Sequence, residues 1–268
     1  MNHKKYTDAN REAWNEVTPI HQKHRKIDLK SKFREKGFST LDSTITDKLH
    51  EIGLKDKTVA QVFCNNGREL LSMINLGAVS GVGFDISDEA IKEADALKLI
   101  SGLNAEFIRT DVYDIDSKYS GKFDLVYLSI GGLVWVPDLE GVFEKISELL
   151  KPGGHLVIYD EHPFYYMLAC EDEEEFDPEL PEKPVYSYFK TDPWVSNSGI
   201  DYIGKTRYKA KTNYNFTHKF SDLINAIAKQ GMIISGLQEY PHDLSGEMER
   251  LERKKILPLS YLLIGIKR

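Results

Sequence analysis

Four short polar stretches follow apolar segments at the points where β-strands would end. Asp85 closes the second of these segments and can accept hydrogen bonds from both hydroxyls of a ribose. Asp111 follows the third segment and can accept from the exocyclic amine of adenine, while Val112 offers a backbone N–H to the ring. Each aspartate alone is also typical of a turn or a helix cap, but this order favours a site for an adenosyl nucleoside. The residues expected to bind it are Cys64, Asn65, Gly67, Asp85, Ile86, Asp111, Val112 and Ser129.

The first of these stretches, Cys-Asn-Asn-Gly at 64–67, has only one glycine. A strand that passes through a tight turn into a helix presents backbone N–H groups to a ligand, and such turns usually carry several glycines. Asparagine tolerates positive φ, so we expect at least one of Asn65 and Asn66 to be left-handed in place of glycine. A dinucleotide-binding loop is disfavoured because the G-x-G-x-x-G spacing fails: Leu70 stands three residues after Gly67.

The elements that must position these residues alternate between strand and helix. Apolar runs predict strands at 58–63, 79–85, 105–110, 123–130 and 155–160, and amphipathic patterns predict helices at 68–77, 87–97 and 138–150. This alternation indicates an α/β fold with a mostly parallel sheet covered on both faces, and ligands in such sheets bind at the carboxyl ends of the strands. A further helix is expected at 219–230, followed by an antiparallel pair of strands at 231–240 and 259–268.

The chain is expected to divide into three parts. Residues 1–57 are polar and helix-leaning and would form an N-terminal segment or cap. Residues 58–160 and 219–268 would form the cofactor-binding core. Between them, residues 161–218 are rich in Tyr, Pro and acids, which indicates an insertion with a small antiparallel sheet.

Composition narrows the possible partners. The net charge of −7 comes largely from eight acids within residues 171–182, so neither a basic nucleic-acid footprint nor a polybasic membrane patch stands out. No segment approaches the roughly 18 consecutive apolar residues of a membrane helix, and the first residues are not typical of a secretory signal. Cys64 and Cys170 are too few for a disulfide framework or a zinc site. We therefore expect a cytoplasmic protein without a metal.

Residues 55–160 and the last strand pair resemble the class I S-adenosylmethionine-dependent methyltransferases. The first motif of that family is an acid followed by glycines at alternate positions, E/D-x-G-x-G-x-G. This chain has Gln61 at the acid and Gly67 at the last glycine, with Phe63 and Asn65 at the other two glycine positions. Phe63 fills a position where backbone normally packs close to the ligand, and Gln61 removes a charge.

Three other stretches carry the resemblance. The acid of the second strand matches Asp85 within GVGFDIS, and the adenine-contacting acid matches Asp111 within RTDVYD. The stretch KFDLVYLSIGGLVWVPDLEGVFEKISELLKPGGHLVIYD, residues 122–160, is similar to the family's fourth strand, helix, Leu-Lys-Pro-Gly-Gly turn and fifth strand. The resemblance implies a doubly wound, mostly parallel seven-stranded sheet with an antiparallel last strand, and S-adenosyl-L-methionine as cofactor.

Methyl transfer from a sulfonium is an in-line displacement, so the enzyme must align the nucleophile, the methyl group and the sulfur, and exclude water. A base is needed only when the nucleophile arrives protonated. His162, just beyond the fifth strand, is the best-placed candidate, although it is also typical of a turn before a proline; Asp160 and Glu161 are its rivals. Trp135 is expected either to wall the pocket or to pack in the core.

The N-terminal segment contains Tyr6, Trp14 and His21, and in related enzymes this segment often folds over the cofactor. His21 and His24 are equally consistent with exposed surface positions. The insertion carries many aromatic side chains, which suit either a pocket for a flat or amphipathic small molecule or the core of a small sheet. These aromatic residues are Tyr165, Tyr166, Tyr186, Tyr188, Trp194, Tyr202, Tyr208 and Tyr214.

The methyl acceptor is expected to be a small molecule. The amide-methylating motif N/D-P-P-Y/F does not follow the fourth strand, where Ser-Ile-Gly-Gly stands at 129–132 instead. Because basic surface is also lacking, nucleic acid is disfavoured. Two alternatives stay open: a non-catalytic protein that binds S-adenosylmethionine or S-adenosylhomocysteine, suggested by Phe63 and Gln61, and a methyltransferase with a macromolecular acceptor.

Overall fold

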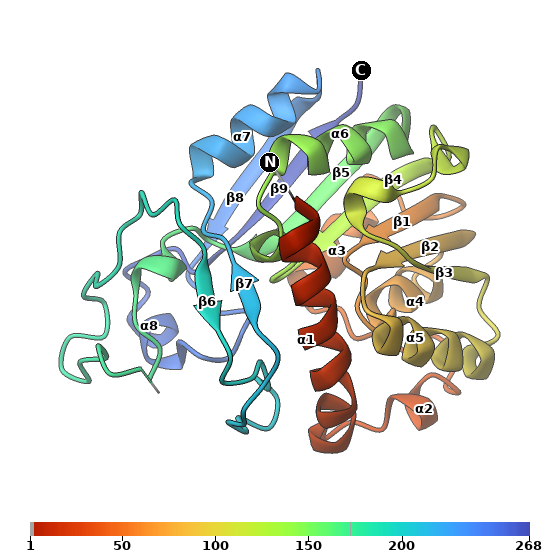
Figure 1. Cartoon of the computed structure of the whole chain (residues 1–268). Coiled ribbons are helices and arrows are strands. Elements are labelled where there is room, and N and C mark those ends of the chain that lie inside the picture. Colours follow the sequence, from red (N-terminus) through yellow and green to blue (C-terminus); the bar gives the residue numbers. More distant parts are fainter. Residues whose placement is uncertain (1–2, 172) are drawn as a thin grey trace.

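The computed structural model describes residues 3–171 and 173–268 and is built on a seven-stranded sheet with helices on both faces (Figure 1). The strand order is β3-β2-β1-β4-β5-β9-β8. The first five strands pair in parallel, and β9 is antiparallel to both β5 and β8. This confirms the predicted fold class. The strands are β1 (Thr58–Val62), β2 (Ser80–Asp85), β3 (Ala105–Arg109), β4 (Phe123–Ser129), β5 (Leu150–Glu161), β8 (Ile233–Tyr240) and β9 (Ser260–Ile266).

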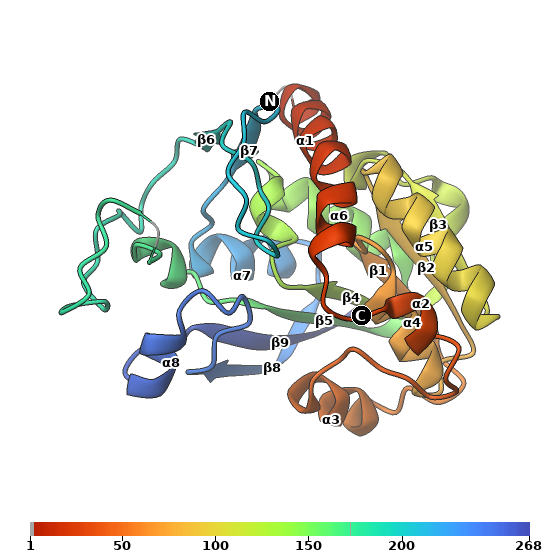
Figure 2. The ribbon, with the colours of Figure 1, turned by 90° about the horizontal axis from the view of Figure 1, so that it is seen from below.

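Alternating side chains of the central strands supply two hydrophobic cores. On one face Ala60, Val126 and Ile158 pack with α6 and α7. On the other face Val59 and Tyr127 pack with α3, α4 and α5, and Figure 2 shows α3 and the pair α6–α7 on opposite sides of the strands. Because successive side chains of a strand point to opposite faces, apolar residues along these strands are buried on both faces of the sheet. The helices are α3 (Ser43–Ile52), α4 (Arg68–Asn75), α5 (Asp88–Ser101), α6 (Leu139–Leu149) and α7 (Phe220–Lys229).

The structure differs from the sequence prediction at the start of β5 and in the segment between β8 and β9. Strand β5 begins at Leu150 and not at 155, because the Lys-Pro-Gly-Gly turn pairs with the end of the chain: Gly153 N donates to Lys267 O at 2.8 Å. The ammonium of Lys267 also donates to Ser147 O and Leu150 O and so caps the end of α6. The antiparallel pair β8–β9 is confirmed, but the polar stretch between them contains a short helix, α8 (Glu249–Lys254).

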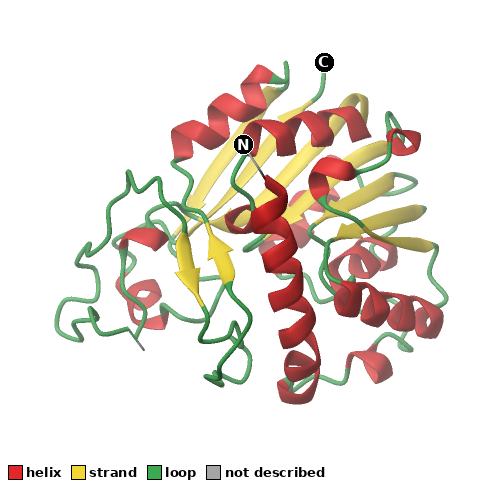
Figure 3. Cartoon of the chain, in the orientation of Figure 1, coloured by secondary structure: helices red, strands yellow, loops and turns green. Residues whose placement is uncertain are grey.

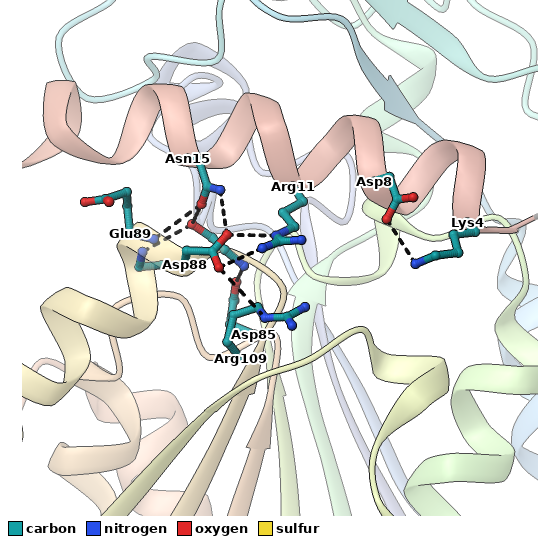
Figure 4. A network of polar contacts seen from close by, with 10 residues as sticks. Lys4, Asp8, Arg11, Asn15, Asp85, Asp88, Glu89 and Arg109 are labelled. Carbon is teal, nitrogen blue, oxygen red and sulfur yellow. Dashed lines mark hydrogen bonds and ion pairs between the residues drawn. The ribbon is translucent and has the colours of Figure 1, made fainter.

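The N-terminal residues are helical, as expected. Helix α1 (His3–His24) lies between α5 on one side and the insertion on the other (Figure 1). The short helix α2 (Leu29–Lys32) then leads to α3. Helix α1 crosses the carboxyl ends of the parallel strands (Figure 4) and therefore covers the edge where a ligand would bind.

The insertion contains a two-stranded antiparallel sheet, β6 (Trp194–Ser196) with β7 (Asn213–Asn215), which confirms the expected small sheet. The rest of it is mostly loop (Figure 3). Short 3₁₀ helices occupy connections elsewhere: η1 (Val112–Asp114), η2 (Ser117–Tyr119), η3 (Leu133–Trp135) and η4 (Tyr165–Met167). Within the described residues, none of the helices combines the length and apolar character needed to cross a bilayer.

Candidate cofactor site

A cavity of about 180 Å³ lies at the carboxyl ends of β1 to β4. Its wall includes seven of the eight residues expected to bind a nucleoside: Cys64, Asn65, Asp85, Ile86, Asp111, Val112 and Ser129. Helix α1 contributes a second wall with Thr7, Asn10, Trp14 and His21, and Arg25 directly after the helix completes it. The cavity is therefore enclosed between the strand ends and the N-terminal helix.

Gly67 is the expected residue that does not line the cavity. Its φ of +73° places it in the left-handed region at the N-terminus of α4. A Cβ here would come within 2.4 Å of the Phe107 ring and 3.0 Å of the Ala94 methyl. Gly67 is therefore required for backbone conformation and for close packing of the loop against α5 and β3, in place of the expected ligand contact.

The loop after β1 answers the question raised by its missing glycines. Asn65 has a φ of +49°, which confirms that an asparagine holds a left-handed turn here. Phe63 is left-handed too, with a φ of +59°, although it is a bulky residue. Its ring fills the space of a side chain at Gly132, where a Cβ would lie 2.7 Å from a Phe63 ring carbon. The glycine that permits close packing at this point is therefore Gly132, in the facing loop after β4.

Asp85 is held by backbone at the end of β2. Asn65 N donates to its Oδ2 at 2.8 Å and Ser87 N to its Oδ1 at 2.9 Å. Burial raises the pKa of Asp85, and the hydrogen bonds from Ser87 and Asn65 oppose that shift. Each carboxylate oxygen accepts one bond here and keeps capacity for another, which suits a ribose diol.

Asp111 occupies the matching position after β3. Its Oδ1 accepts from Tyr113 N at 3.2 Å, so the side chain caps the 3₁₀ helix η1 while it lines the cavity. Val112 beside it is buried. The capping role expected as an alternative and the ligand-facing position are therefore combined in one residue.

Helix α1 is fastened to the start of α5, directly after Asp85 (Figure 4). The guanidinium of Arg11 donates to both oxygens of Asp88, at 2.7 and 2.8 Å, and Asn15 Nδ2 donates to the same carboxylate at 2.7 Å. The hydrogen bond from Arg11 lowers the pKa of Asp88. A hydrogen bond of 2.9 Å from Ser87 Oγ to Asn15 Oδ1 completes the contact. Directly after α1, Arg25 forms a largely buried ion pair with Glu93 of α5.

Aromatic side chains enclose the other end of the cavity. Trp14 of α1 meets Trp135 of η3 edge to face, with ring centroids 5.2 Å apart. The ring of His21 lies 4.4 Å from that of Tyr202 in the insertion. Asn10 links the same parts, because its side chain donates to the carbonyls of Trp135 and Tyr214 and accepts from Tyr214 N. Trp135 and Tyr202 thus line the cavity, as two of the aromatic residues considered from the sequence.

His21 is buried and points its Nε2 at the carbonyl oxygen of Ile200, 3.1 Å away. A carbonyl only accepts, so Nε2 carries the proton and Nδ1 keeps a lone pair. Burial lowers the pKa of His21, which favours the neutral ring. Asp201 lies 3.6 Å from Nε2 and also binds His24 Nδ1 at 3.0 Å. His21 is therefore a neutral imidazole beside a buried carboxylate, which is an arrangement suited to accepting a proton.

His162 does not lie on this cavity, contrary to the expectation for a catalytic base. Its Nε2 contacts Glu239 Oε1 at 2.9 Å, and its Nδ1 accepts from Phe164 N at 3.2 Å. After β5 the chain turns towards β9, as shown by the bond from His162 N to Leu259 O, and so carries the ring to the β8 side of the sheet. The ring stacks on Phe220 there. Both nitrogens are engaged, so the geometry favours a structural role.

Asp160 and Glu161, the rivals of His162, are also removed from the cavity wall. Asp160 is buried and its Oδ1 accepts from Gly131 N at 2.7 Å and from Glu161 N at 2.8 Å. Burial raises the pKa of Asp160 to about 7 and that of Glu161 to about 8. Because Gly131 lines the cavity, Asp160 acts on the site by holding the loop after β4.

A second, wider cavity of about 860 Å³ adjoins the first at Trp135 and Tyr202. It lies between the insertion and α8 and has walls of both charges. The charged side chains are Glu171, Asp201, Lys205, Arg207, Glu247, Glu249, Arg250 and Arg253. Among the described residues, no group of three or more His, Cys, Asp and Glu side chains could hold a metal ion.

Sequence reasoning missed three charged residues of the first cavity, namely Arg25, Arg68 and Glu69. Arg68 and Glu69 open the helix that follows the loop, so their place next to the loop was the available signal. Arg25 lies more than 30 residues before the first strand, and nothing in the sequence indicated how the N-terminal helix would fold back.

Comparisons with known proteins agree with this geometry. A protein-family model described as a methyltransferase domain matches residues 54–214. The ubiquinone biosynthesis O-methyltransferase of Pseudoalteromonas translucida is 28% identical over 170 residues, which cover 61% of this chain and 70% of that protein. The protein of the same name from Escherichia coli O127:H6 is 33% identical over 102 residues, which span only 42% of its length and 38% of this chain.

Solved structures share the fold at low sequence identity. An S-adenosylmethionine dependent methyltransferase from Mesorhizobium loti superposes with a TM-score of 0.61 and 20% identity, covering 82% of this chain and 96% of its own. One from Methanosarcina mazei gives a TM-score of 0.59 and 18% identity, covering 85% and 98%. These likenesses extend the similarity beyond residues 54–214 to most of the chain.

Proposed function

Because the chain belongs to the family of S-adenosylmethionine-dependent methyltransferases, whose cofactor is S-adenosylmethionine, we propose that it transfers a methyl group to a small organic molecule. The carrying observation is the cavity at the ends of β1 to β4, where Asp85, Asp111 and a left-handed Asn65 meet in the order expected for an adenosyl ligand. Phe63 is accommodated by Gly132, so the departure from the family's glycines leaves the loop well packed. This favours a binding-competent site over a decayed one.

The strand order supports one orientation of the cofactor. Adenine would lie by Asp111 after β3, the ribose by Asp85 after β2, and the amino-acid moiety between the ends of β1 and β4. When bound, the cofactor supplies an electrophilic methyl group on a sulfonium. Trp14, Trp135 and Tyr202 would surround that group, exclude water and fix the line of approach.

The wider cavity is the proposed acceptor site. It joins the cofactor cavity at Trp135 and Tyr202, and its size falls in the range of about 300–1,000 Å³ that is usual for small-molecule pockets. Relatives named for ubiquinone biosynthesis and for sterol 24-C-methylation support a small acceptor. In this proposal the N-terminal segment, residues 1–57, and the insertion, residues 161–218, together cap the core formed by 58–160 and 219–268.

His21 is the proposed base where the acceptor is protonated. Its ring adjoins Tyr202, which both cavities share, and its Nδ1 keeps the lone pair. Asp201 would stabilise the imidazolium that forms after proton transfer. The role proposed from the sequence for His162 passes to His21 on this geometry, and His162 serves as a matched control: His21→Asn should lower the rate with hydroxyl or ammonium acceptors more than His162→Asn does.

Two experiments test the proposal. Calorimetry with S-adenosylhomocysteine should show binding that Asp85→Ala weakens by about 1.5–3 kcal/mol, because hydrogen bonds to a charged acceptor are lost. Incubation with S-adenosylmethionine and pooled phenols, amines and thiols, followed by mass spectrometry, should reveal a product heavier by one methyl group with release of S-adenosylhomocysteine. Binding without turnover of any pool would instead favour a cofactor-binding protein or a macromolecular acceptor.

A further inference from the structure

We propose that Glu69, positioned by Gln61, binds the ammonium group of the cofactor's amino-acid moiety. The proposal rests on the binding of S-adenosylmethionine proposed above. It gives a role to a charged residue that the sequence motif does not contain, and it explains how the chain manages without an acid at position 61.

Among the described residues, the wall of the cavity carries three carboxylates: Glu69, Asp85 and Asp111. Asp85 and Asp111 follow β2 and β3, where the ribose and adenine lie. Glu69 follows β1, on the side of β4, and is the carboxylate left for the far end of the ligand. That end carries an ammonium, and a charge taken into a cavity needs an opposite charge beside it.

The side chain of Glu69 is held in position by Gln61. Gln61, 1% exposed, donates from Nε2 to Glu69 Oε2 at 2.6 Å and to Ser129 Oγ at 3.3 Å. One carboxylate oxygen is therefore fixed by the amide, which leaves Oε1 to accept from a ligand. Glu69 also lies in the first turn of α4, where the helix dipole favours negative charge.

The amide of Gln61 contains an unpaired acceptor atom. Gln61 Oε1 is buried without a hydrogen-bond partner among the described residues. Turning the amide over would bring its oxygen against the carboxylate oxygen of Glu69, where two acceptors repel each other. The amide therefore keeps an unsatisfied acceptor in order to point its N–H groups at Glu69 and Ser129. A buried polar group left unpaired is costly, so this orientation indicates that positioning Glu69 matters.

Gln61 stands where the family motif has an acid, and Glu69 comes eight residues later. In this chain the carboxylate therefore lies in the first turn of α4 and not on β1, and Gln61 on β1 is hydrogen-bonded to it. Glu69 and Tyr202 both line the cofactor cavity.

The test compares two ligands of which only one carries the amino-acid moiety. S-Adenosylhomocysteine carries the amino-acid moiety, whereas 5′-methylthioadenosine has the same adenine, ribose and thioether sulfur without it. Glu69→Gln should weaken binding of S-adenosylhomocysteine by about tenfold or more, since a charged hydrogen bond is lost. Its affinity for 5′-methylthioadenosine should stay within about twofold, which also shows that the cavity is folded.

Two further variants sharpen the comparison. Gln61→Met removes the positioning amide and should give a smaller loss that is again confined to S-adenosylhomocysteine. Asp85→Asn should weaken both ligands alike, because it acts on the ribose. Equal losses for both ligands in Glu69→Gln, or no loss for either, would overturn the assignment of Glu69. Failure of the unmodified protein to bind either ligand would overturn the proposed cofactor itself.

Discussion

Two buried aspartates, one at the end of a sheet strand and one in the insertion, have pKa values displaced in opposite directions. Asp160 lies on the sheet side, at the end of β5, and burial raises its pKa to about 7 although two backbone N–H groups bind one of its oxygens. Asp201 lies on the cap side. Burial alone would raise its pKa, but hydrogen bonds from Gly204, Thr206 and His24 outweigh it and hold the value at about 2.

The difference shows how the two sides are built. On the sheet side, the loop after β4 and β5 itself supply backbone donors, and Asp160 lines a small pocket with Leu133, Leu139 and Leu223. On the cap side, α1 and the insertion are far apart in sequence and meet through aromatic contacts and through charged and polar side chains, as in the contact between His24 and Asp201. The sheet side is therefore expected to be rigid at any moderate ionic strength, while the cap is sensitive to charge.

The largest expected effect is on the sheet side. Asp160→Asn keeps the oxygen that accepts from Gly131 and Glu161 but removes the charge. Because the folded-state pKa is raised, the unmodified protein loses stability as pH rises from about 4 to 7, and the variant escapes this loss. The variant should be more stable at pH 8 by up to about 4 kcal/mol, with little difference near pH 4. Urea unfolding followed by tryptophan fluorescence measures both.

Glu161 moderates that result without changing its sign. Burial and the adjacent Asp160 raise its pKa to about 8, so part of the pH response belongs to Glu161 and persists in Asp160→Asn. A difference in unfolding free energy that is the same at pH 4 and pH 8 would show that Asp160 is not protonated in the folded protein.

Asp201→Asn should have the opposite sign. A depressed folded-state pKa contributes stability above about pH 4, and this is lost as pH falls towards 2. The variant should therefore be less stable at pH 7, by about 1–2 kcal/mol, because the wider cavity beside Asp201 lets water screen part of the interaction. The same unfolding experiment measures it, and a stabilised variant at pH 7 would refute the contrast between the two sides.

A smaller effect is expected in the loop after β1. Asn65→Gly should be nearly neutral for folding, since φ at this position is +49° and glycine accepts it freely. Asn65→Val should cost about 1 kcal/mol or more, because a β-branched side chain is strained in that region. Thermal unfolding of the two variants side by side gives the answer. Equal melting temperatures would mean that the loop relaxes without cost.

The sheet side could be predicted from the sequence, and the cap could not. Asp85 and Asp111 were found because strand periodicity fixes where each strand ends, and parallel strands bring those ends to one edge. The left-handed turn at Asn65 followed from local backbone preference. His21 and Glu69 required knowledge of tertiary contacts: a histidine on a polar helix carries no local signal that distinguishes a cavity from solvent.

The position of His162 away from the cofactor cavity was unpredictable for a related reason. Its position just after β5 was read correctly, but whether the chain next turns towards β4 or β9 depends on pairing with strands about 100 residues later. In the same way, the start of β5 was mistaken because the Lys-Pro-Gly-Gly turn pairs with the chain end. Long-range pairing, more than local preference, decided both.

The smallest effect expected is at the exposed contact between α1 and α5, where Arg11→Ala removes the paired hydrogen bonds to Asp88. Both side chains are more than a third exposed, so the loss should be about 0.5–1 kcal/mol. Because α1 covers the cofactor cavity, it should appear as two- to fivefold faster release of S-adenosylhomocysteine in stopped-flow fluorescence at low salt. Lys4→Ala is the matched control, since Lys4 pairs with Asp8 within α1 and lies away from the start of α5 (Figure 4). Salt at about 1 M should erase the difference by screening. Equal release rates for the two variants at low salt would mean that the contact between Arg11 and Asp88 does not hold α1 over the cavity.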